Sequence, residues 1–389
     1  MFNSLKTTLS ILSECTLFLC ACHNTASTKQ NMTDTLAQGS LPPKANFEKT
    51  IDGKKTDLYI LKNSKGMEAA ITNFGGRLVS IIIPDKNGKP TDVVEGFDSV
   101  EGYKNAPGPY YGAIIGRYGN RIAKGKFTLD GKQYSLFINN APNTLHGGKK
   151  GYDSQVWDAK QIDSTTLELT YLSKDMEEGF PGNLQVKVVY HLTDDNGLKI
   201  SYTAQTDKTT IVNLTNHAYY NLNGSGAGSI LDHQVEINAD GYTPIDSTSI
   251  PLGPIESVKG TPFDFTKPAI IGSRINDINQ QLKNGRGYDH NYVLNKHDDK
   301  TPAAIVVGDK TGIEMQVFTE EPGLQFYTGN FMNGENTMKH GNKDVFRTAF
   351  AMETEHYPDS PNEPSYPSVV LKPGQTYQTS TEYKFSVVK

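Results

Sequence analysis

Residues 211–224 (IVNLTNHAYYNLNG) combine a strand-like alternation with a high density of hydrogen-bonding side chains. With the two-residue period of a β-strand, Leu214 faces one side, whereas His217 and Tyr219 face the other. A plain solvent-facing strand more often carries Lys, Glu and Thr. The pattern therefore predicts one core face and one polar binding face, on which His217 is the titratable member.

A second segment, residues 347–364, carries two carboxylates on one side of a similar alternation. Phe350 and Met352 fall on the apolar face, and Glu353 and Glu355 fall on the other. Small alanines beside Glu353 leave a recess, and a carboxyl group that is partly desolvated in a recess has a raised pKa. An exposed acidic strand end is the alternative, and the alternation alone does not separate Glu353 from Glu355.

Two further segments offer groups that could hold a ligand. Arg117 and Arg121 lie four residues apart among glycines in residues 114–127 (IIGRYGNRIAKGKF). A buried arginine is costly unless it is paired, so one of them is expected to meet a carboxylate or a polar ligand. His146 precedes two glycines in NTLHGG, where it could contact a ligand or lie on a plain surface loop.

Asp289, in GYDHN, and Gln325, in EPGLQFY, add short directional hydrogen-bonding groups beside aromatic residues. Aromatic faces with a rim of Asn, Gln, Asp, Arg and His are typical of sites that hold a sugar, which has apolar ring faces and hydroxyl edges. The nine histidines show no HxH or HExxH spacing, so a catalytic metal is not expected.

The elements that must position these residues are short strands. Alternating β-branched or aromatic runs are separated by turn dipeptides such as Asn-Gly and Asp-Gly, which is typical of antiparallel hairpins. The runs are 167–172, 186–192, 198–204, 313–319 and 383–388. Only Arg274–Asn284 resembles a short helix, and no nucleotide-binding glycine loop occurs. We expect an all-β fold, a large antiparallel β-sandwich.

The composition limits the function classes. The chain of 389 residues has a net charge of −5 and no basic block, so we expect no nucleic-acid partner. All three cysteines lie within the first 22 residues, which excludes a disulfide or cysteine metal site in the fold. Residues 1–22 resemble a secretory signal whose end, Leu-Cys-Ala-Cys, is similar to a lipoprotein cleavage box. We expect an exported protein of the periplasm or cell envelope, with Cys22 as the candidate lipidation site and the only membrane attachment.

The composition of residues 23–46 is that of a flexible polar tether, and the folded domain is expected to span residues 47–389.

Six motifs in order give the sequence a specific resemblance to the aldose 1-epimerase family. They are GRYGNRI, NTLHGG, NLTNHAYYNLNG, YDHNY, EPGLQFYTGNF and METEHYPDSPN, and the likeness covers about residues 47–388. The resemblance implies a galactose-mutarotase type β-sandwich without a required cofactor. It also implies that free aldohexoses such as glucose and galactose are the substrates. Gly119, where Ala is common, and Ala218, where Ser is common, are mild departures.

The resemblance also assigns roles. It places the catalytic acid on His217 and the catalytic base on Glu353, which settles the choice between Glu353 and Glu355. It places sugar-binding positions on Asn120, Arg121, His146, Asp289 and Gln325, and Tyr219 is a further candidate from the polar face of its strand.

Three rival functions remain at this point. A glycoside hydrolase could use Asp289 and Glu353 as its two carboxylates. A sugar-binding lipoprotein would bind without needing the Glu353 carboxylate, and a sugar-phosphate epimerase would need a basic phosphate pocket. We expect a monomer; a structural Ca²⁺ held by Asp and Asn loops has no spacing signature that the sequence would reveal.

Overall fold

The computed structural model describes residues 39–106, 108, 110–298 and 300–388. The expected signal segment, with Cys22, lies outside the described residues, as does most of the expected tether. The packed chain begins before the expected start at Phe47. A 3₁₀ helix covers Lys44–Phe47, and Leu41 packs against the apolar cluster that contains the fully buried Phe47.

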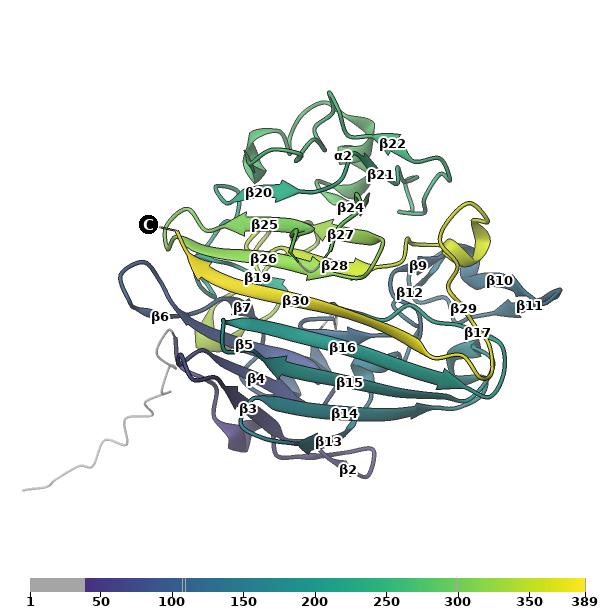
Figure 1. Cartoon of the computed structure of the whole chain (residues 1–389), viewed down its shortest axis with the longest axis horizontal. Coiled ribbons are helices and arrows are strands. Elements are labelled where there is room, and N and C mark those ends of the chain that lie inside the picture. Colours follow the sequence, from purple (N-terminus) through teal and green to yellow (C-terminus); the bar gives the residue numbers. More distant parts are fainter. Residues whose placement is uncertain (1–38, 107, 109, 299, 389) are drawn as a thin grey trace, which may run out of the picture. The chain divides into compact units, whose positions relative to one another are not determined.

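One nine-stranded antiparallel sheet crosses the fold, and β30 lies in its middle (Figure 1). Its order is β13 (Asp158–Gln161), β14 (Thr166–Ser173), β15 (Leu184–Leu192), β16 (Gly197–Thr206), β30 (Tyr377–Val387), β26 (Ile313–Thr319), β25 (Ala304–Val307), β20 (Gln234–Ile237) and β23 (Ala269–Ile270). All five runs expected as strands lie in this sheet, since their alternating apolar residues face a core, as Val186, Val188 and Tyr190 do.

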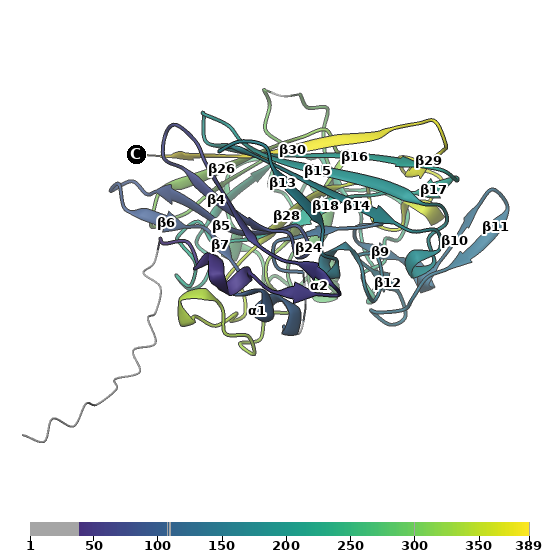
Figure 2. The same cartoon turned by 90° about the horizontal axis from the view of Figure 1, so that it is seen from below.

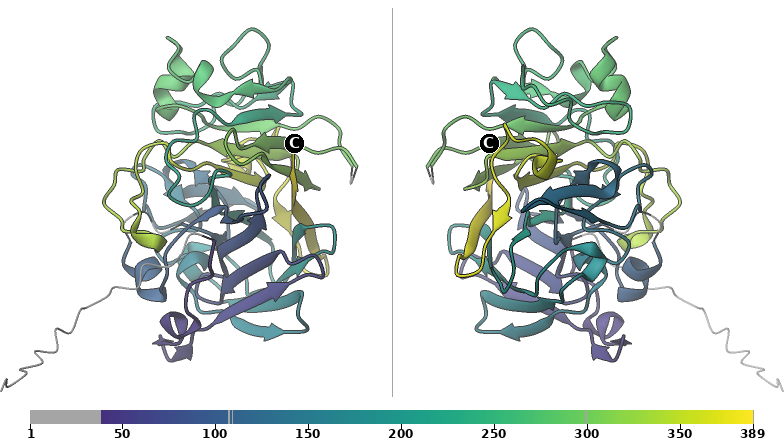
Figure 3. Two further views of the ribbon diagram at one scale, coloured as in Figure 1. Left: turned by 90° about the vertical axis from the view of Figure 1, so that its left-hand side faces the viewer. Right: turned by 90° about the vertical axis from the view of Figure 1, so that its right-hand side faces the viewer.

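Two smaller sheets pack beneath this sheet (Figures 2 and 3). The five-stranded sheet is β22 (Glu256–Ser257), β21 (Gly241–Tyr242), β24 (Asp289–Val293), β27 (Gly323–Tyr327) and β28 (Ala351–Glu355). The four-stranded sheet is β3 (Leu58–Lys62), β4 (Glu68–Thr72), β5 (Arg77–Pro84) and β6 (Pro90–Asp92). A shared apolar core takes residues from all three sheets, among them Ile81, Val188 and Phe326. The expected antiparallel β-sandwich is confirmed.

Paired short strands complete the fold. They are β1 (Thr50–Ile51) with β2 (Lys54–Lys55), β7 (Val94–Glu95) with β19 (Tyr219–Tyr220), β8 (Ala113–Ile115) with β18 (Thr215–His217), β9 (Arg121–Ile122) with β12 (Thr144–Leu145), β10 (Lys126–Leu129) with β11 (Lys132–Ser135), and β17 (Thr210–Ile211) with β29 (Val370–Leu371). The segment expected as one strand over residues 211–224 is thus divided among β17, β18 and β19. Both of its faces are buried, because it runs between sheets rather than along a surface.

Helix is scarce among the described residues. The α-helices are α1 (Val100–Asn105) and α2 (Gln280–Gly285). The helix expected over Arg274–Asn284 is shorter, because the Asn279 side chain accepts hydrogen bonds from the amides of Gln281 and Leu282 and so fixes the helix start. No helix in the described part of the chain has the length and apolar character that a membrane crossing requires.

Candidate active site

The five-stranded sheet positions three of the site residues, Asp289, Gln325 and Glu353. In its antiparallel register Asn291, Gln325 and Glu353 stand opposite one another on three neighbouring strands. The alternate residues of these strands, such as Phe326 and Met352, point into the apolar core. A row of polar groups is therefore held on one rigid face because the other face is anchored by burial.

His217 reaches the same face from β18, whose backbone pairs with β8. Its Nε2 atom lies 3.4 Å from Oε1 of Glu353, and the two side chains are 6% and 3% exposed. The His217 ring stacks on the Tyr219 ring, with centroids 4.9 Å apart. The structure thus brings together the two groups that the sequence identified as an acid and a base.

Burial shifts the pKa values of His217 and Glu353 in the directions that favour the uncharged form of each side chain. It lowers the pKa of His217 to about 3, and the buried Arg77 guanidinium adds to this effect. It raises the pKa of Glu353 well above its ordinary value. The neighbouring Glu355 and Asp289 carboxyls raise it further, whereas Arg121 opposes the shift. Both shifts therefore favour a neutral pair, in which the proton is on Glu353 and not on His217.

His146 forms a third side of the site. Its ring centroid lies 5.2 Å from that of His217, and its Nδ1 accepts a hydrogen bond from the backbone N–H of Asn120 at 3.1 Å. Burial and the neighbouring His217 hold the pKa of His146 well below its usual value, so the ring is neutral. A neutral imidazole whose Nδ1 accepts must carry its proton on Nε2. His146 is therefore a fixed hydrogen-bond donor at Nε2.

This tautomer bears on metal binding. One side-chain atom each from His146, His217 and Glu353 lie within 4.8 Å of one another, a grouping that could hold a metal ion by distance alone. A metal needs an unprotonated imidazole nitrogen, however. The free nitrogen of His146 is the protonated one, so ligation would first require breaking its hydrogen bond with Asn120. The donor set therefore does not fit a resident metal.

A cavity of about 310 Å³ opens onto these groups. Its lining residues are Gly108, Tyr110, Asn120, Arg121, Asn140, Leu145, His146, His217, Tyr219, Asp289, Tyr327, Phe331 and Glu353. Seven of the eight site residues expected from the sequence are among them. Gln325 is not a lining residue. Its Nε2 donates a hydrogen bond to Oδ1 of Asp289 at 2.8 Å, so it helps to orient Asp289, which does line the cavity.

Arg117 and Arg121 occupy different places relative to the cavity. Arg117 is buried away from the cavity and donates hydrogen bonds to main-chain oxygens such as those of Pro181 and Gly182, and to the hydroxyl of Ser173. Arg121 is half-buried at the cavity wall, where its Nε donates to Oδ1 of Asn140. Arg117 therefore stabilises the fold, and Arg121 is the guanidinium available to a ligand.

Glu353 and Glu355 also differ in their access to the cavity. Glu353 lines the cavity. Glu355 lies two residues further along the same strand, β28, and does not line the cavity. Glu355 is fully buried and accepts hydrogen bonds from the side-chain amides of Asn120 and Asn291. The geometry thus agrees with Glu353 as the group that can touch a ligand.

Some lining residues were not identified from the sequence. The Tyr110 ring packs edge-on to His146 with centroids 4.5 Å apart, and Phe331 stands 49% exposed at the wall. Both lie in loops with no strand alternation, so no periodic pattern marked them. The adjacent tyrosines of PYYGAI, of which Tyr110 is the first, are the one local signal that could have drawn attention to this wall.

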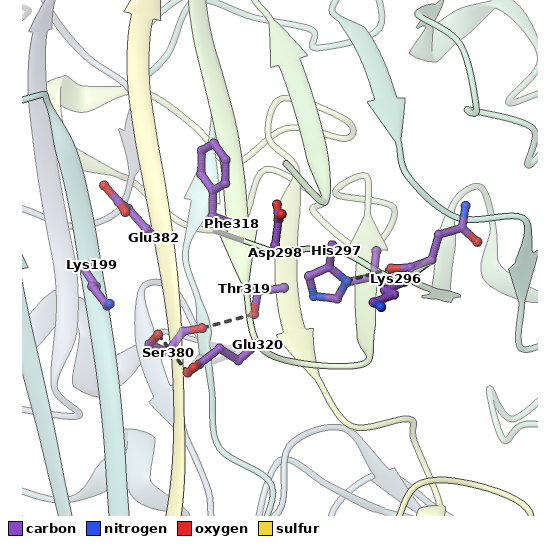
Figure 4. Close-up of a pocket in the computed structure, with 11 residues that line it drawn as sticks. Lys199, Lys296, His297, Asp298, Phe318, Thr319, Glu320, Ser380 and Glu382 are labelled. Carbon is purple, nitrogen blue, oxygen red and sulfur yellow. Dashed lines mark hydrogen bonds between the residues drawn. The ribbon is translucent and has the colours of Figure 1, made fainter. Parts of the chain in front are cut away.

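A larger cavity of about 520 Å³ lies elsewhere, over the solvent side of β16, β26 and β30 (Figure 4). Its charged lining residues, such as Lys199, Lys296 and Glu320, are exposed. Its hydrogen bonds join neighbours of the sheet, as between Ser380 Oγ and Oε2 of Glu320 at 3.0 Å. It lacks a buried acid–base pair among its lining residues, so the smaller cavity is the better candidate for chemistry.

Comparisons with known proteins agree on one family. The aldose 1-epimerase family profile matches residues 57–384. Galactose mutarotase of Bos taurus is 44% identical over 324 residues, which cover 83% of this chain and 92% of the relative. Aldose 1-epimerase of Escherichia coli K12 is 39% identical over 338 residues, covering 86% and 96%.

Solved structures show the same relationship. The galactose 1-epimerase of Lactobacillus acidophilus NCFM superposes with a TM-score of 0.78 at 28% identity, covering 88% of this chain and 97% of the other. The aldose epimerase homologue of C. elegans gives a TM-score of 0.78 at 29% identity, covering 86% and 100%.

Proposed function

The chain belongs to the aldose 1-epimerase family, and from that premise we propose that it interconverts the α and β anomers of free aldohexoses such as glucose and galactose. The proposal is carried by one observation: a buried imidazole and a buried carboxyl group, 3.4 Å apart, both open onto a cavity of about 310 Å³. That volume suits one small polar ligand.

Ring opening needs a proton removed from the C1 hydroxyl and a proton delivered to the ring oxygen. Glu353 takes the first, and protonated His217 gives the second. The pair enters this step as imidazolium and carboxylate and leaves it as imidazole and carboxylic acid. The neutral pair, which burial favours, is therefore the form that accompanies the open-chain sugar.

Closure reverses these transfers after rotation about the C1–C2 bond. Glu353 returns its proton to the carbonyl oxygen at C1, and His217 removes the proton from the C5 hydroxyl as that oxygen attacks C1. Attack on the other face gives the other anomer. One proton thus circulates within the pair, and the reaction uses no further proton donor.

The remaining groups hold the sugar. His146 donates from Nε2, and the pKa of Asp289 is raised by burial while Arg121 opposes that shift. Asn120 and Tyr219 lie beside these groups on the wall, and Gln325 fixes Asp289. Fixing the ring hydroxyls keeps each proton transfer short, which is how binding energy lowers the barrier.

Polarimetry tests the activity directly. Crystalline α-D-glucose or α-D-galactose is dissolved, purified protein is added, and the drift of optical rotation is compared with buffer alone. We expect acceleration that is lost in Glu353→Gln. Sugar binding without acceleration would favour a binding protein, and cleavage of a nitrophenyl glycoside would favour a hydrolase.

The proposed reaction requires no metal or cofactor, and the chain is proposed to act as a monomer. Dialysis against a chelator should leave the rate unchanged, and light scattering should give the mass of one chain. A loss of activity that Ca²⁺ restores would instead identify a structural ion.

We further propose export to the cell envelope, supported by the composition of residues 1–22 and by the Leu-Cys-Ala-Cys sequence that ends at Cys22. Fractionation of cells that express the full chain tests export. Incorporation of labelled fatty acid that is lost in Cys22→Ala tests lipidation, and labelling that survives this substitution would contradict it.

A further inference from the structure

Glu355 is a second buried carboxyl group that the proposed reaction does not use. It is fully buried at the end of β28, two residues beyond Glu353. Its Oε1 accepts hydrogen bonds from Nδ2 of Asn120 at 2.8 Å and from Nδ2 of Asn291 at 3.2 Å. A Cβ atom at Gly119 would lie 3.1 Å from its Oε2, so a glycine there leaves room for the carboxyl group.

Asn120 connects this carboxyl group to the cavity. Its backbone N–H donates to Nδ1 of His146 at 3.1 Å, and its carbonyl oxygen accepts from the backbone N–H of His146 at 3.0 Å. Two reciprocal bonds thus fix the His146 ring relative to the Asn120 backbone.

The Asn120 side chain has one permitted orientation. Its Oδ1 accepts from the backbone N–H of Arg121 at 3.0 Å, so its Nδ2 must point away from that amide, toward Glu355. Asn120 also has a φ of +62°, a left-handed conformation that a side chain must help to hold. Because the amide is buried, loss of its acceptor would leave an unpaired donor.

We propose that Glu355 is a positioning residue of the sugar site: its carboxyl group holds the Asn120 amide, and through Asn120 it keeps the His146 ring with Nε2–H facing the sugar. This inference rests on the proposed function for its catalytic consequence, whereas the orientation of His146 can be measured without any substrate.

The charge of Glu355 gives a second, separable signal. The titratable groups that face it are Glu353, Glu321, Asp289, Tyr118 and Tyr377. Burial, together with Glu321 and Asp289, raises the pKa of Glu355 to about 8, although the Asn120 and Asn291 amides oppose the shift. When ionised, Glu355 raises the pKa of Glu353, so the catalytic pair keeps its proton to higher pH.

Glu355→Gln and Glu355→Leu separate the two effects. Gln keeps an acceptor for Asn120 but cannot ionise. We expect a KM within about twofold of the wild type, and an alkaline limb of kcat/KM that moves to lower pH. Leu removes the acceptor, and we expect kcat/KM to fall by tenfold or more, as for a displaced positioning group.

Nitrogen-15 NMR of histidine-labelled protein, without sugar, tests the orientation. The wild type and Glu355→Gln should show His146 as the Nε2–H tautomer, and Glu355→Leu should show a mixture or the other tautomer. An unchanged Nε2–H signal in folded Glu355→Leu would overturn the proposal. An alkaline limb that does not move in Glu355→Gln would overturn its electrostatic part.

Glu95→Gln is the matched control. Glu95 is also a buried carboxyl group with two donors, Ser225 Oγ at 2.8 Å and the Gly226 N–H at 2.7 Å, and it does not line the cavity. It should leave the His146 tautomer and the alkaline limb unchanged. If the wild type accelerates no aldose, the proposed function fails, while the NMR comparison still decides the role of Glu355.

Discussion

The His217–Glu353 pair and the Lys339–Asp92 pair are both buried, yet they are built in opposite ways. The Lys339 ammonium is fully buried and reaches Oδ2 of Asp92 at 2.7 Å, the Val79 carbonyl oxygen and the Ser80 hydroxyl. By contrast, His217 Nδ1 and Glu353 Oε2 have no hydrogen-bond partner among the described residues. The Lys339 ammonium, with three oxygen contacts, holds segments together, whereas the His217–Glu353 pair beside the cavity keeps atoms available to a ligand.

Removal of the base should give the largest effect. Glu353→Gln keeps the shape but cannot accept the C1 hydroxyl proton, so kcat should fall roughly 10²–10⁴-fold, the range for lost acid–base catalysis. Polarimetry measures the rate, and thermal unfolding confirms that the variant is folded. His217→Asn should behave alike, and full activity in either variant would contradict the assigned roles.

Removal of the buried amine should damage the fold instead. Lys339→Met leaves Asp92 buried without its cation, which costs about 3–5 kcal/mol of unfolding free energy. Urea unfolding measures the loss, and polarimetry at low temperature should give a near-normal rate per folded molecule. If Lys339→Met were stable but inactive, the claim that the Lys339–Asp92 pair serves stability and not catalysis would be wrong.

The pH dependence of stability should follow the site carboxyls. Burial raises the pKa of Glu353, and it raises that of Glu355 to about 8, so folding favours their protonated forms. Their stabilising contribution is complete below about pH 4 and is lost as the pH rises through the folded pKa values. Because the buried histidines are already neutral in both states above about pH 7, the unfolding free energy should fall from pH 7 to pH 9, and fall less in Glu353→Gln. An equal fall in both would show that Glu353 titrates normally.

The smallest effect should come from Gln325. Because its amide contacts Asp289 and not the cavity, Gln325→Leu should raise KM by less than about tenfold with little change in kcat. Initial rates over a range of sugar concentrations measure both constants. Asp289→Asn is the paired variant, and it should raise KM more.

The strand period predicted the fold class and the polar face of His217, whereas the binding roles of Asn120, Arg121, His146, Asp289 and Gln325 came from the resemblance to the aldose 1-epimerase family. Alternating apolar residues gave the long strands, and the polar face that includes His217 and the recess beside Glu353 followed from the same period. The alternation could not decide whether Glu353 or Glu355 is the catalytic carboxyl group, since both lie on the same face of the strand. That choice depends on the β18 strand crossing beside β28, a contact between residues 136 positions apart that no local pattern records.

Residues outside regular strands were harder to place. Tyr110 and Phe331 reach the cavity from loops, and Arg117 and Arg121 differ only in what the fold packs around them. Segment 211–224 was expected as one strand with a core face and a polar binding face. It is divided and buried because it joins three different strand pairs in turn.

The place of β30 has a consequence for biosynthesis. Among the described strands, β30 lies between β16 and β26 and is the one that joins the β13–β16 half of the nine-stranded sheet to the other half. The sheet therefore cannot close until Tyr377–Val387 has left the ribosome. A chain that we propose to be exported gains from this delay, because a secretion channel that passes unfolded polypeptide meets it before the sandwich can form.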